Sequence, residues 1–179
     1  MKRDSQIGIT GYGAAAYEKK TDRTLFSFLT EAGRNALDSA GLSFSDVDGL
    51  AISSFELPPD NTVTAAEQFG MSISWAYLGT AGSAGPVASI INSVHAIESG
   101  QATTVLCIAG DNYDVGGHFK LMDNFSRGLR NYGTPQGFGG ANGLFAIIQR
   151  KHMETYGTRI EDLGRISVGQ RKSARENES

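Results

Sequence analysis

Cysteine is nearly absent from this sequence, since Cys107 is the single one among 179 residues. One cysteine excludes an internal disulfide and any zinc site built from several thiolates. The three histidines, His95, His118 and His152, are not spaced as metal ligands in the sequence. No metal site is therefore predicted.

Long apolar runs and an excess of basic residues are lacking as well. No run of about 18 apolar residues occurs, so no membrane-spanning helix is predicted. The start, MKRDSQIGITGYG, is broken by glycine and is not typical of a secretory signal. A net charge of −3 argues against a nucleic-acid binder. These absences predict a cytoplasmic protein without a nucleic-acid partner.

Glycine, in contrast, is abundant, with 23 residues, about twice the usual share. The glycines form no repeat, which excludes collagen-like and low-complexity chains. They stand at the ends of predicted elements and in the segment 110–143, which points to tight turns and one irregular region.

Hydrophobic periodicity predicts strands that alternate with helices. Such an order implies parallel strands joined by helical crossovers. The run TTVLCIAG is typical of a central strand buried on both faces, and Cys107 within it is expected to pack as an unreactive thiol. The predicted strands are 6–12, 49–54, 74–79 and 103–110, and the predicted helices are 24–40, 61–69, 84–99 and 141–156.

Two details of the helices are predicted from side-chain pattern. Helix 84–99 carries an apolar stripe that is expected to face the core, formed by Val87, Ile90, Ile91, Val94 and Ile97. A last helix is expected to follow Gly157, with Thr158 and Glu161 as its capping box.

The segment 111–140 breaks this rhythm, because it is aromatic, rich in glycine and too long for a plain connection. It is predicted to be a functional loop, from which His118 can reach a ligand. The basic set in the last helix is interpreted first as a solvated face, and second as a phosphate or partner site; its members are Arg165, Arg171, Lys172 and Arg175.

Two short motifs invite a specific function. The stretch GYGAAA, with Gly11 and Gly13, resembles a dinucleotide fingerprint, but no helix begins directly after it, so a turn that ends a strand is favoured. The stretch AGSAG around Ser83 resembles a nucleophile elbow. A serine hydrolase triad would add Asp111 or Asp114 and then His152. This alternative stays open, and the second interpretation is that His152 is a solvent-exposed helix residue.

The chain as an ordered pattern resembles the N-terminal half of the thiolase superfamily, in particular sterol-carrier-protein-x-type thiolases and acetyl-CoA acetyltransferase-like proteins. The resemblance covers residues 5–177 and rests on ITGYG, LTEAGRNALDSAGLSFSDVDGLAISS, GSAGPVASIINSVHAIESGQATTVLCIAGD and FGGANGLFAIIQRKHMETYGT. It implies an α/β fold with a βαβαβαββ mixed sheet and helices on both faces. Residues 1–179 would form one N-terminal thiolase domain, with 111–140 as a loop excursion and the C-terminal half absent.

The resemblance also implies chemistry on coenzyme A thioesters, with acyl-CoA as substrate and no covalently bound cofactor. The family's nucleophilic cysteine stands at the start of the third helix, where the helix N-terminus stabilises a thiolate. That place falls on Ser83 here, and a hydroxyl needs an adjacent base to attack a thioester. The segment that lines the family's acyl pocket supplies the expected substrate contacts, namely His118, Phe119, Met122 and Tyr132.

Three hypotheses follow from the resemblance. The first is a subunit or fragment of an acetyl-CoA acetyltransferase-like enzyme of lipid metabolism, with Ser83 at the nucleophile's place. The second is a cysteine-lacking aldol-lyase that works with a zinc-bearing OB-fold partner, with Tyr113 or Tyr132 in acid–base or substrate contacts. The third is a non-catalytic assembly subunit. Under all three hypotheses the chain is expected to assemble with another chain. It would form either a homodimer through this half, or a heteromer with a C-terminal thiolase half or with the OB-fold partner.

Overall fold

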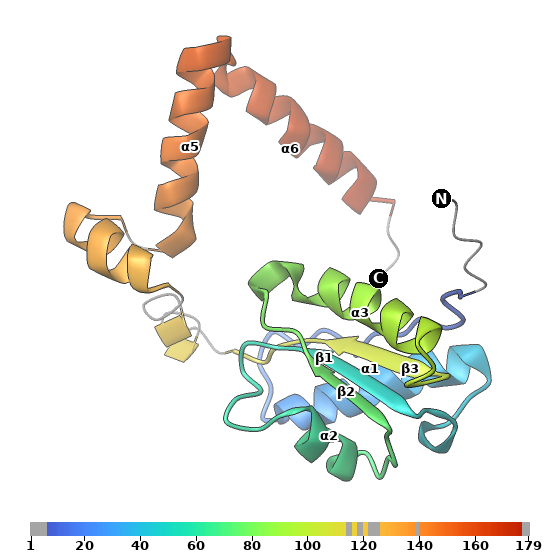
Figure 1. Cartoon of the computed structure of the whole chain (residues 1–179). Coiled ribbons are helices and arrows are strands. Elements are labelled where there is room, and N and C mark those ends of the chain that lie inside the picture. Colours follow the sequence, from blue (N-terminus) through green and yellow to red (C-terminus); the bar gives the residue numbers. More distant parts are fainter. Residues whose placement is uncertain (1–6, 114–115, 118–119, 122–125, 139, 177–179) are drawn as a thin grey trace. The chain divides into compact units, whose positions relative to one another are not determined.

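The computed structural model describes residues 7–113, 116–117, 120–121, 126–138 and 140–176 (Figure 1). The chain divides into two compact units, Met1–Asp114 and Val115–Ser179. Among the described residues, no helix combines the length and the apolar character that crossing a membrane requires.

The first unit consists of helices and strands in alternation, as the periodicity predicts. Helix α1 ends at Gly41, whose φ of 69° lies in the left-handed region that glycine adopts without strain. The predicted element bounds are confirmed to within two residues for the six elements α1 (Leu25–Ala40), β1 (Gly49–Ser53), α2 (Thr62–Gln68), β2 (Trp75–Leu78), α3 (Gly85–Glu98) and β3 (Val105–Ala109).

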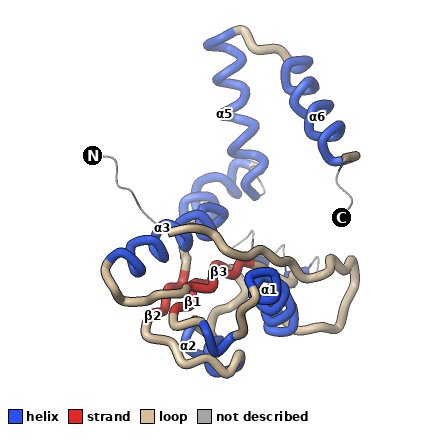
Figure 2. The backbone as a smooth tube through the Cα atoms, turned by 90° about the vertical axis from the view of Figure 1, so that its right-hand side faces the viewer, coloured by secondary structure: helices blue, strands red, loops and turns tan. Residues whose placement is uncertain are grey.

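The three strands form a parallel sheet in the order β2-β1-β3. In its register Ala51 of β1 lies between Tyr77 of β2 and Cys107 of β3. Helix α3 covers one face of the sheet, and α1 and α2 cover the other (Figures 1 and 2). Helices on both faces of a small parallel sheet confirm the predicted α/β class.

The central strand is β1 and not β3, which corrects the sequence-based prediction. Every residue of β1 is buried. Among the described residues, strand β3 pairs with β1 on one side and with no strand on the other. The residues of β3 alternate between buried and more exposed positions. Cys107 therefore points away from the main core instead of packing inside it.

The two faces of the sheet are packed differently. Toward α1 and α2 lies the hydrophobic core, which includes Leu29, Leu37, Leu50, Ile52, Leu106 and Ile108. Toward α3 the contacts are made by small residues, because the buried positions of that helix are Gly85, Ser89, Ser93 and Ala96. The predicted apolar stripe of helix 84–99 is thus not its buried face: Val87 and Ile91 are exposed.

The predicted strand 6–12 is wrong for its described part, because residues 7–18 form no strand. This segment is held on α1 instead: Tyr12 N donates to Ser39 Oγ at 2.8 Å, and Asn35 Nδ2 donates to Ala14 O at 2.8 Å. A Cβ atom on Gly11 or Gly13 would overlap the backbone of α1. The two glycines of GYG thus permit close packing on a helix.

The second unit is helical in its described part. A π-helical turn (Leu129–Gly133) and a 3-10 turn (Thr134–Gln136) precede α5 (Gly140–Tyr156) and α6 (Ile160–Ala174). The predicted cap of the last helix is one residue off, since Arg159 is its N-cap and its amide donates to Asp162 Oδ2 at 2.9 Å.

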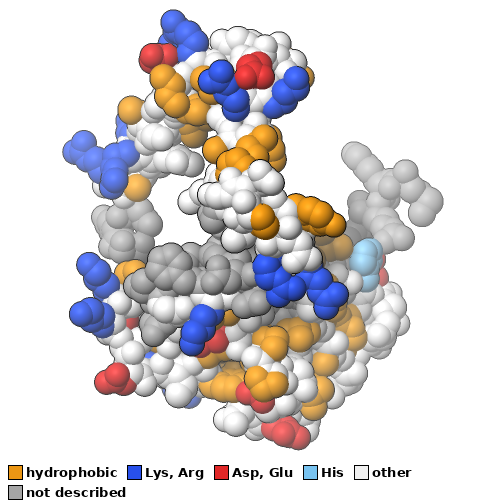
Figure 3. Space-filling view, turned by 90° about the vertical axis from the view of Figure 1, so that its left-hand side faces the viewer, with side chains coloured by type: hydrophobic (Ala, Val, Ile, Leu, Met, Phe, Trp, Pro, Cys, Tyr) orange, Lys and Arg blue, Asp and Glu red, His pale blue; other side chains and the backbone are white. Residues whose placement is uncertain are grey.

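Helices α5 and α6 contain no buried residue. Their large apolar side chains are exposed among Lys and Arg side chains (Figure 3). The exposed apolar residues are Leu144, Phe145, Ile147, Ile148, Tyr156, Ile160, Ile166 and Val168.

Candidate functional site at the carboxyl edge of the sheet

Because the three strands are parallel, their carboxyl ends meet at one edge of the sheet, where α/β proteins commonly place functional groups. Ser53 ends β1, and its Oγ lies 3.5 Å from the carbonyl oxygen of Gly79, just after β2. A Cβ atom on Gly85 would overlap Ser53 Oγ. The start of α3 is therefore packed directly on this edge.

Ser83 lies in the 3-10 turn Gly82–Ala84, immediately before α3. Its residue is exposed, and among the described residues its side chain makes no hydrogen bond that would activate it as a nucleophile. The first amides of a helix lack intrahelical partners and form its positive end. Ser83 thus stands where the resemblance implies a nucleophile, next to a helix terminus that favours negative charge; its reactivity stays a prediction.

Asp111 joins two strands at the same edge. It follows β3, and its Oδ1 accepts hydrogen bonds from Ser54 Oγ at 2.7 Å, from the Phe55 amide at 2.7 Å and from the Glu56 amide at 3.0 Å. These donors belong to the loop that leaves β1. The carboxylate predicted as a triad acid is thus engaged by a loop backbone and a serine hydroxyl.

Glu56 makes the reciprocal contact. Its Oε2 accepts a hydrogen bond from the Asn112 amide at 2.6 Å, and Asn112 Nδ2 donates to the carbonyl oxygen of Arg23 at 2.7 Å. Burial, followed by the charges of Asp111 and Glu56, raises the pKa of the adjacent Tyr113 phenol. A tyrosine phenol is protonated at neutral pH even without this shift, and the higher pKa makes it a weaker acid; the hydroxyl group can donate a hydrogen bond.

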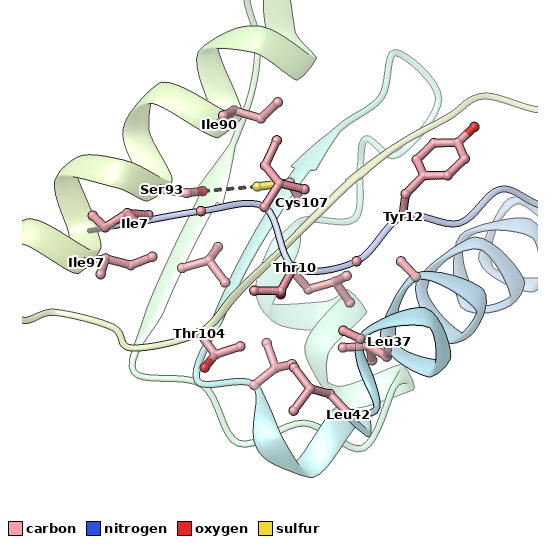
Figure 4. Close-up of a pocket in the computed structure, with 18 of the residues that line it drawn as sticks. Ile7, Thr10, Tyr12, Leu37, Leu42, Ile90, Ser93, Ile97, Thr104 and Cys107 are labelled. Atoms are coloured by element: carbon pink, nitrogen blue, oxygen red, sulfur yellow. Dashed lines mark hydrogen bonds between the residues drawn. The ribbon is translucent and has the colours of Figure 1, made fainter. Parts of the chain in front are cut away.

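Cys107 lies in a different place, on the wall of an apolar cavity of about 360 Å³ (Figure 4). The cavity lies between β3, the segment Ile7–Tyr12 and helices α1 and α3, and its lining does not include Ser83. Desolvation raises the pKa of the Cys107 thiol, and a contact of 3.2 Å with Ser93 Oγ works in the opposite direction. A thiol of raised pKa is a poor nucleophile at neutral pH.

Of the four predicted substrate contacts, Tyr132 is the one that lies within the described residues. Tyr132 is 79% exposed in the π-helical turn. His118, Phe119 and Met122 lie outside the described residues, as does Asp114.

The contacts of His95, His152 and Arg165 are typical of surface residues. His152 Nδ1 lies 3.0 Å from Thr158 Oγ1, and its ring packs on Tyr156. His95 is exposed, with Glu98 at 3.6 Å, and Arg165 forms an ion pair with Asp162 at 3.2 Å. Over the described ranges, no group of three or more His, Cys, Asp or Glu side chains is arranged to hold a metal ion.

Sequence reasoning missed Ser54, Glu56 and Asn112 as part of this edge. A partial signal was available, because polar residues stand at the carboxyl ends of two predicted strands: SSFE after GLAI and DNY after VLCIAG. Polar groups at the carboxyl ends of parallel strands are expected to lie close together.

Two curated relatives of this chain are a lyase and an aldolase. A 17-hydroxy-3-oxo-4-pregnene-20-carboxyl-CoA lyase from Mycobacterium tuberculosis is 30% identical over 179 residues, which cover 96% of this chain and 46% of that protein. A steroid side-chain-cleaving aldolase from Thermomonospora curvata is 28% identical over 176 residues, which cover 94% of this chain and 45% of that protein. No protein-family model matches the chain.

One solved structure, an Ltp2-ChsH2(DUF35) aldolase, aligns with 95% of this chain and 44% of its own chain, with a TM-score of 0.74 and 24% identity. The chain thus spans just under half the length of the curated relatives it matches. The resemblance in the sequence is confirmed at the level of the fold: this chain has a thiolase-like α/β fold.

Proposed function

We propose that this chain is part of a thiolase-fold aldolase that cleaves a carbon–carbon bond in a β-hydroxyacyl-CoA thioester with a bulky, steroid-like acyl group. The similarity to a curated CoA-ester lyase and a curated steroid side-chain-cleaving aldolase along nearly the whole chain carries this proposal. It favours the second hypothesis from the sequence over the acetyl-CoA acetyltransferase hypothesis.

The reaction requires proton transfers and no nucleophilic thiol. A base takes the proton of the β-hydroxyl group, whose oxygen becomes a carbonyl as the bond between the α and β carbons breaks. The electron pair of that bond moves into the thioester as an enolate, and an acid then protonates the α carbon. A chain whose single thiol has a raised pKa, on a strand away from the start of α3, suits this chemistry better than acyl transfer.

Two groups of the carboxyl edge suit steps of this reaction. The Tyr113 hydroxyl, whose pKa is raised by burial and two carboxylates, is protonated at neutral pH and fits a hydrogen-bond donor to a substrate oxygen. The Ser83 hydroxyl, beside the positive end of α3, offers a hydrogen-bond donor to the oxygen on which enolate charge develops. In this proposal Ser83 acts as a donor and does not carry an acyl group.

The proposal includes protein partners. The solved aldolase is named for two components, Ltp2 and ChsH2(DUF35), and we propose a partner of the DUF35 type for this chain. The apolar side chains exposed on α5 and α6 support the need for a covering partner (Figure 3). Self-association of this half remains part of the proposal, and acyl-CoA is its small-molecule ligand.

Turnover of the coenzyme A ester named for the Mycobacterium tuberculosis relative tests the proposal. The chain, a DUF35-type partner and their mixture are each incubated with the ester, and products are followed by liquid chromatography and mass spectrometry. We expect the mixture to release a ketone and a shortened acyl-CoA without added free coenzyme A. Cleavage that depends on free coenzyme A would indicate thiolysis instead, and the absence of cleavage in all three samples would overturn the proposal.

Acyl transfer is the second candidate, because Ser83 stands at the start of α3. Intact-mass measurement after incubation with acetyl-CoA separates the two candidates. An acetyl adduct that maps to Ser83 and disappears in Ser83→Ala would favour acyl transfer. The aldolase proposal predicts no adduct on the native chain.

A further inference from the structure

Strand β3 has an outer edge whose backbone groups lack partners. On its inner side, toward β1, the Gly49 amide donates to the carbonyl oxygen of Thr104 at 3.1 Å. Because the direction of hydrogen bonding alternates along a strand, the outward amide and carbonyl groups are those of Val105, Cys107 and Ala109. Among the described residues, no hydrogen bond reaches these outward groups. The sheet is therefore open on this side.

The apolar cavity beside Cys107 runs along this outer edge. The segment Ile7–Tyr12 faces β3 across the cavity, α3 lines it with Ile90 and Ile97, and α1 lines it with Leu37 (Figure 4). None of the described lining residues is charged. The cavity is not sealed, because Ile90 is 42% exposed. An extended segment can thus enter it.

We propose that this cavity receives one β-strand of a second polypeptide, which pairs with the outer edge of β3 and lies between β3 and the segment Ile7–Tyr12. A row of regularly spaced backbone donors and acceptors is matched by another strand, which is how open sheet edges bind extended segments. A small molecule would fill apolar space but leave that row unpaired. The inference concerns assembly and does not rest on the proposed reaction.

The lining of the cavity defines the chemistry of the strand that fits. Ile90 and Ile97 of α3 would cover one face of the strand, and Leu37 of α1 would cover the other. A strand buried on both faces is a short, continuous apolar run. About five residues match the length of β3, which has five. Such a strand would also bury Ile90 and Ile97, which belong to the apolar stripe that the sequence places on α3.

We assign this strand to the portion of a thiolase-fold protein that the present chain does not match. The chain covers 46% and 45% of its two curated relatives, so each relative contains more than half of its polypeptide outside the matched part. A second copy of this chain fits less well. Its other edge strand, β2, is packed against α2 and α3 and cannot enter the cavity as a bare strand.

Hydrogen exchange in the free chain, read residue by residue by NMR, is the first test. The amides of Val105, Cys107 and Ala109 should exchange at least tenfold faster than those of Leu106 and Ile108, which face β1. Equal protection of the two sets in dilute protein would mean that the edge is already paired, and would overturn the proposal. Protection that appears as the protein concentration rises would identify a second copy as the occupant and overturn the assignment.

Binding of the partner is the second test. The probe is the unmatched portion of the Mycobacterium tuberculosis relative, co-expressed with this chain as a separate polypeptide. In the complex, the three outward amides should exchange as slowly as the inward ones. Alkylation of Cys107 by iodoacetamide should slow at least tenfold, because the strand covers the cavity wall. The absence of a complex, or a complex that leaves both readouts unchanged, would contradict the proposal.

A matched pair of variants locates the strand. Ile90 and Ile91 are adjacent on α3 and similarly exposed, at 42% and 52%, but Ile90 lines the cavity and Ile91 does not. Ile90→Lys should weaken binding of the probe at least tenfold, because the strand would bury an unpaired charge. Ile91→Lys should bind as wild type does. Thermal unfolding of both free variants verifies that the fold is kept.

Equal effects of the two substitutions on binding would overturn this placement of the strand. None of these measurements depends on turnover. A negative aldolase assay would therefore count against the proposed function alone, whereas unprotected outward amides in the complex would count against the strand alone.

Discussion

The Sγ atom of Cys107 lies 3.2 Å from the Oγ atom of Ser93, across the contact between β3 and α3. Ser93 Oγ donates its hydrogen to the carbonyl oxygen of Ser89 at 2.7 Å, one turn earlier in the helix. The Cys107 thiol thus lies beside a buried hydroxyl group and an apolar cavity. A reactive thiol instead lies at a helix N-terminus or near a positive charge, where its pKa is lowered.

The reactivity of Cys107 toward iodoacetamide is the first prediction. Because desolvation raises the pKa of Cys107 while Ser93 lowers it, the wild-type thiol should react more slowly than a free thiol at neutral pH. In Ser93→Ala the pKa should rise further and the rate fall roughly two- to tenfold, the equivalent of one hydrogen bond. Ser99→Ala, at the exposed end of α3, serves as control. A faster reaction in Ser93→Ala would contradict this account of the site.

The glycines of GYG give a second prediction, about stability. Gly13→Ala should lower the free energy of unfolding by roughly 1–3 kcal/mol, because the added Cβ overlaps the backbone of α1 at Asn35 and Ala36. Gly8→Ala is the matched control, since no atom lies within 4 Å of its added Cβ. Its effect should stay within about 0.5 kcal/mol. Chemical denaturation of both variants provides the comparison, and equal stabilities would show that the segment does not pack on α1 in solution.

The sequence predicts the elements of the first unit well because their signals are local. The helix of α1 follows from apolar spacing and ends at Gly41, and the strands follow from short apolar runs between turn residues. The segment 6–12, which was wrongly predicted to be a strand, also has apolar alternation, but its glycines allow it to pack closely against a helix. Periodicity alone does not distinguish these two uses of a short alternating segment.

The buried face of α3 escaped prediction for a different physical reason. The sequence pattern suggests that the large residues Val87 and Ile91 are buried, yet the helix lies so close to the sheet that small residues must face it. Gly85 packs on Ser53, and Ser89 is 1% exposed. Similarly, the bond between Asp111 and Ser54 depends on strand order, which a single sequence does not contain.

Asp48 provides a prediction of pH dependence. Burial by itself would raise the pKa of Asp48, but hydrogen bonds from Thr104 and Thr103 outweigh burial and lower it. The amides of Thr103 and Thr104 each donate to Oδ1 at 2.9 Å, and Thr103 Oγ1 donates to Oδ2 at 2.8 Å. A lowered folded-state pKa means that the stabilisation is present above the unfolded pKa of about 4 and is lost as the pH falls through the folded value.

Asp48→Asn should therefore be less stable than wild type at pH 7 by about 1–3 kcal/mol, the usual contribution of hydrogen bonds to a charged group. The difference in unfolding free energy between the two proteins should shrink as the pH falls below about 4. Urea denaturation at a series of pH values measures this difference. A difference that is constant with pH would show that Asp48 does not act through its charge.

The contact between Gly85 and Ser53 yields the last prediction, which concerns the geometry of the candidate site itself. Alanine normally favours a helix over glycine by up to about 1 kcal/mol, so Gly85→Ala would stabilise α3 if its start were free. Here the added Cβ overlaps Ser53 Oγ, and the carbonyl oxygen of Gly79 lies 3.3 Å away, so the variant should instead be destabilised by roughly 1–3 kcal/mol. Removing the hydroxyl in Ser53→Ala/Gly85→Ala should recover part of that loss, although Ser53 Cβ still lies 3.2 Å from the new methyl group.

A double-mutant cycle from thermal or urea unfolding measures the energetic coupling between the Ser53 and Gly85 substitutions. Additive effects of the two substitutions would mean that α3 does not begin against the carboxyl edge of β1, and Ser83 would then no longer belong to the same site as Asp111.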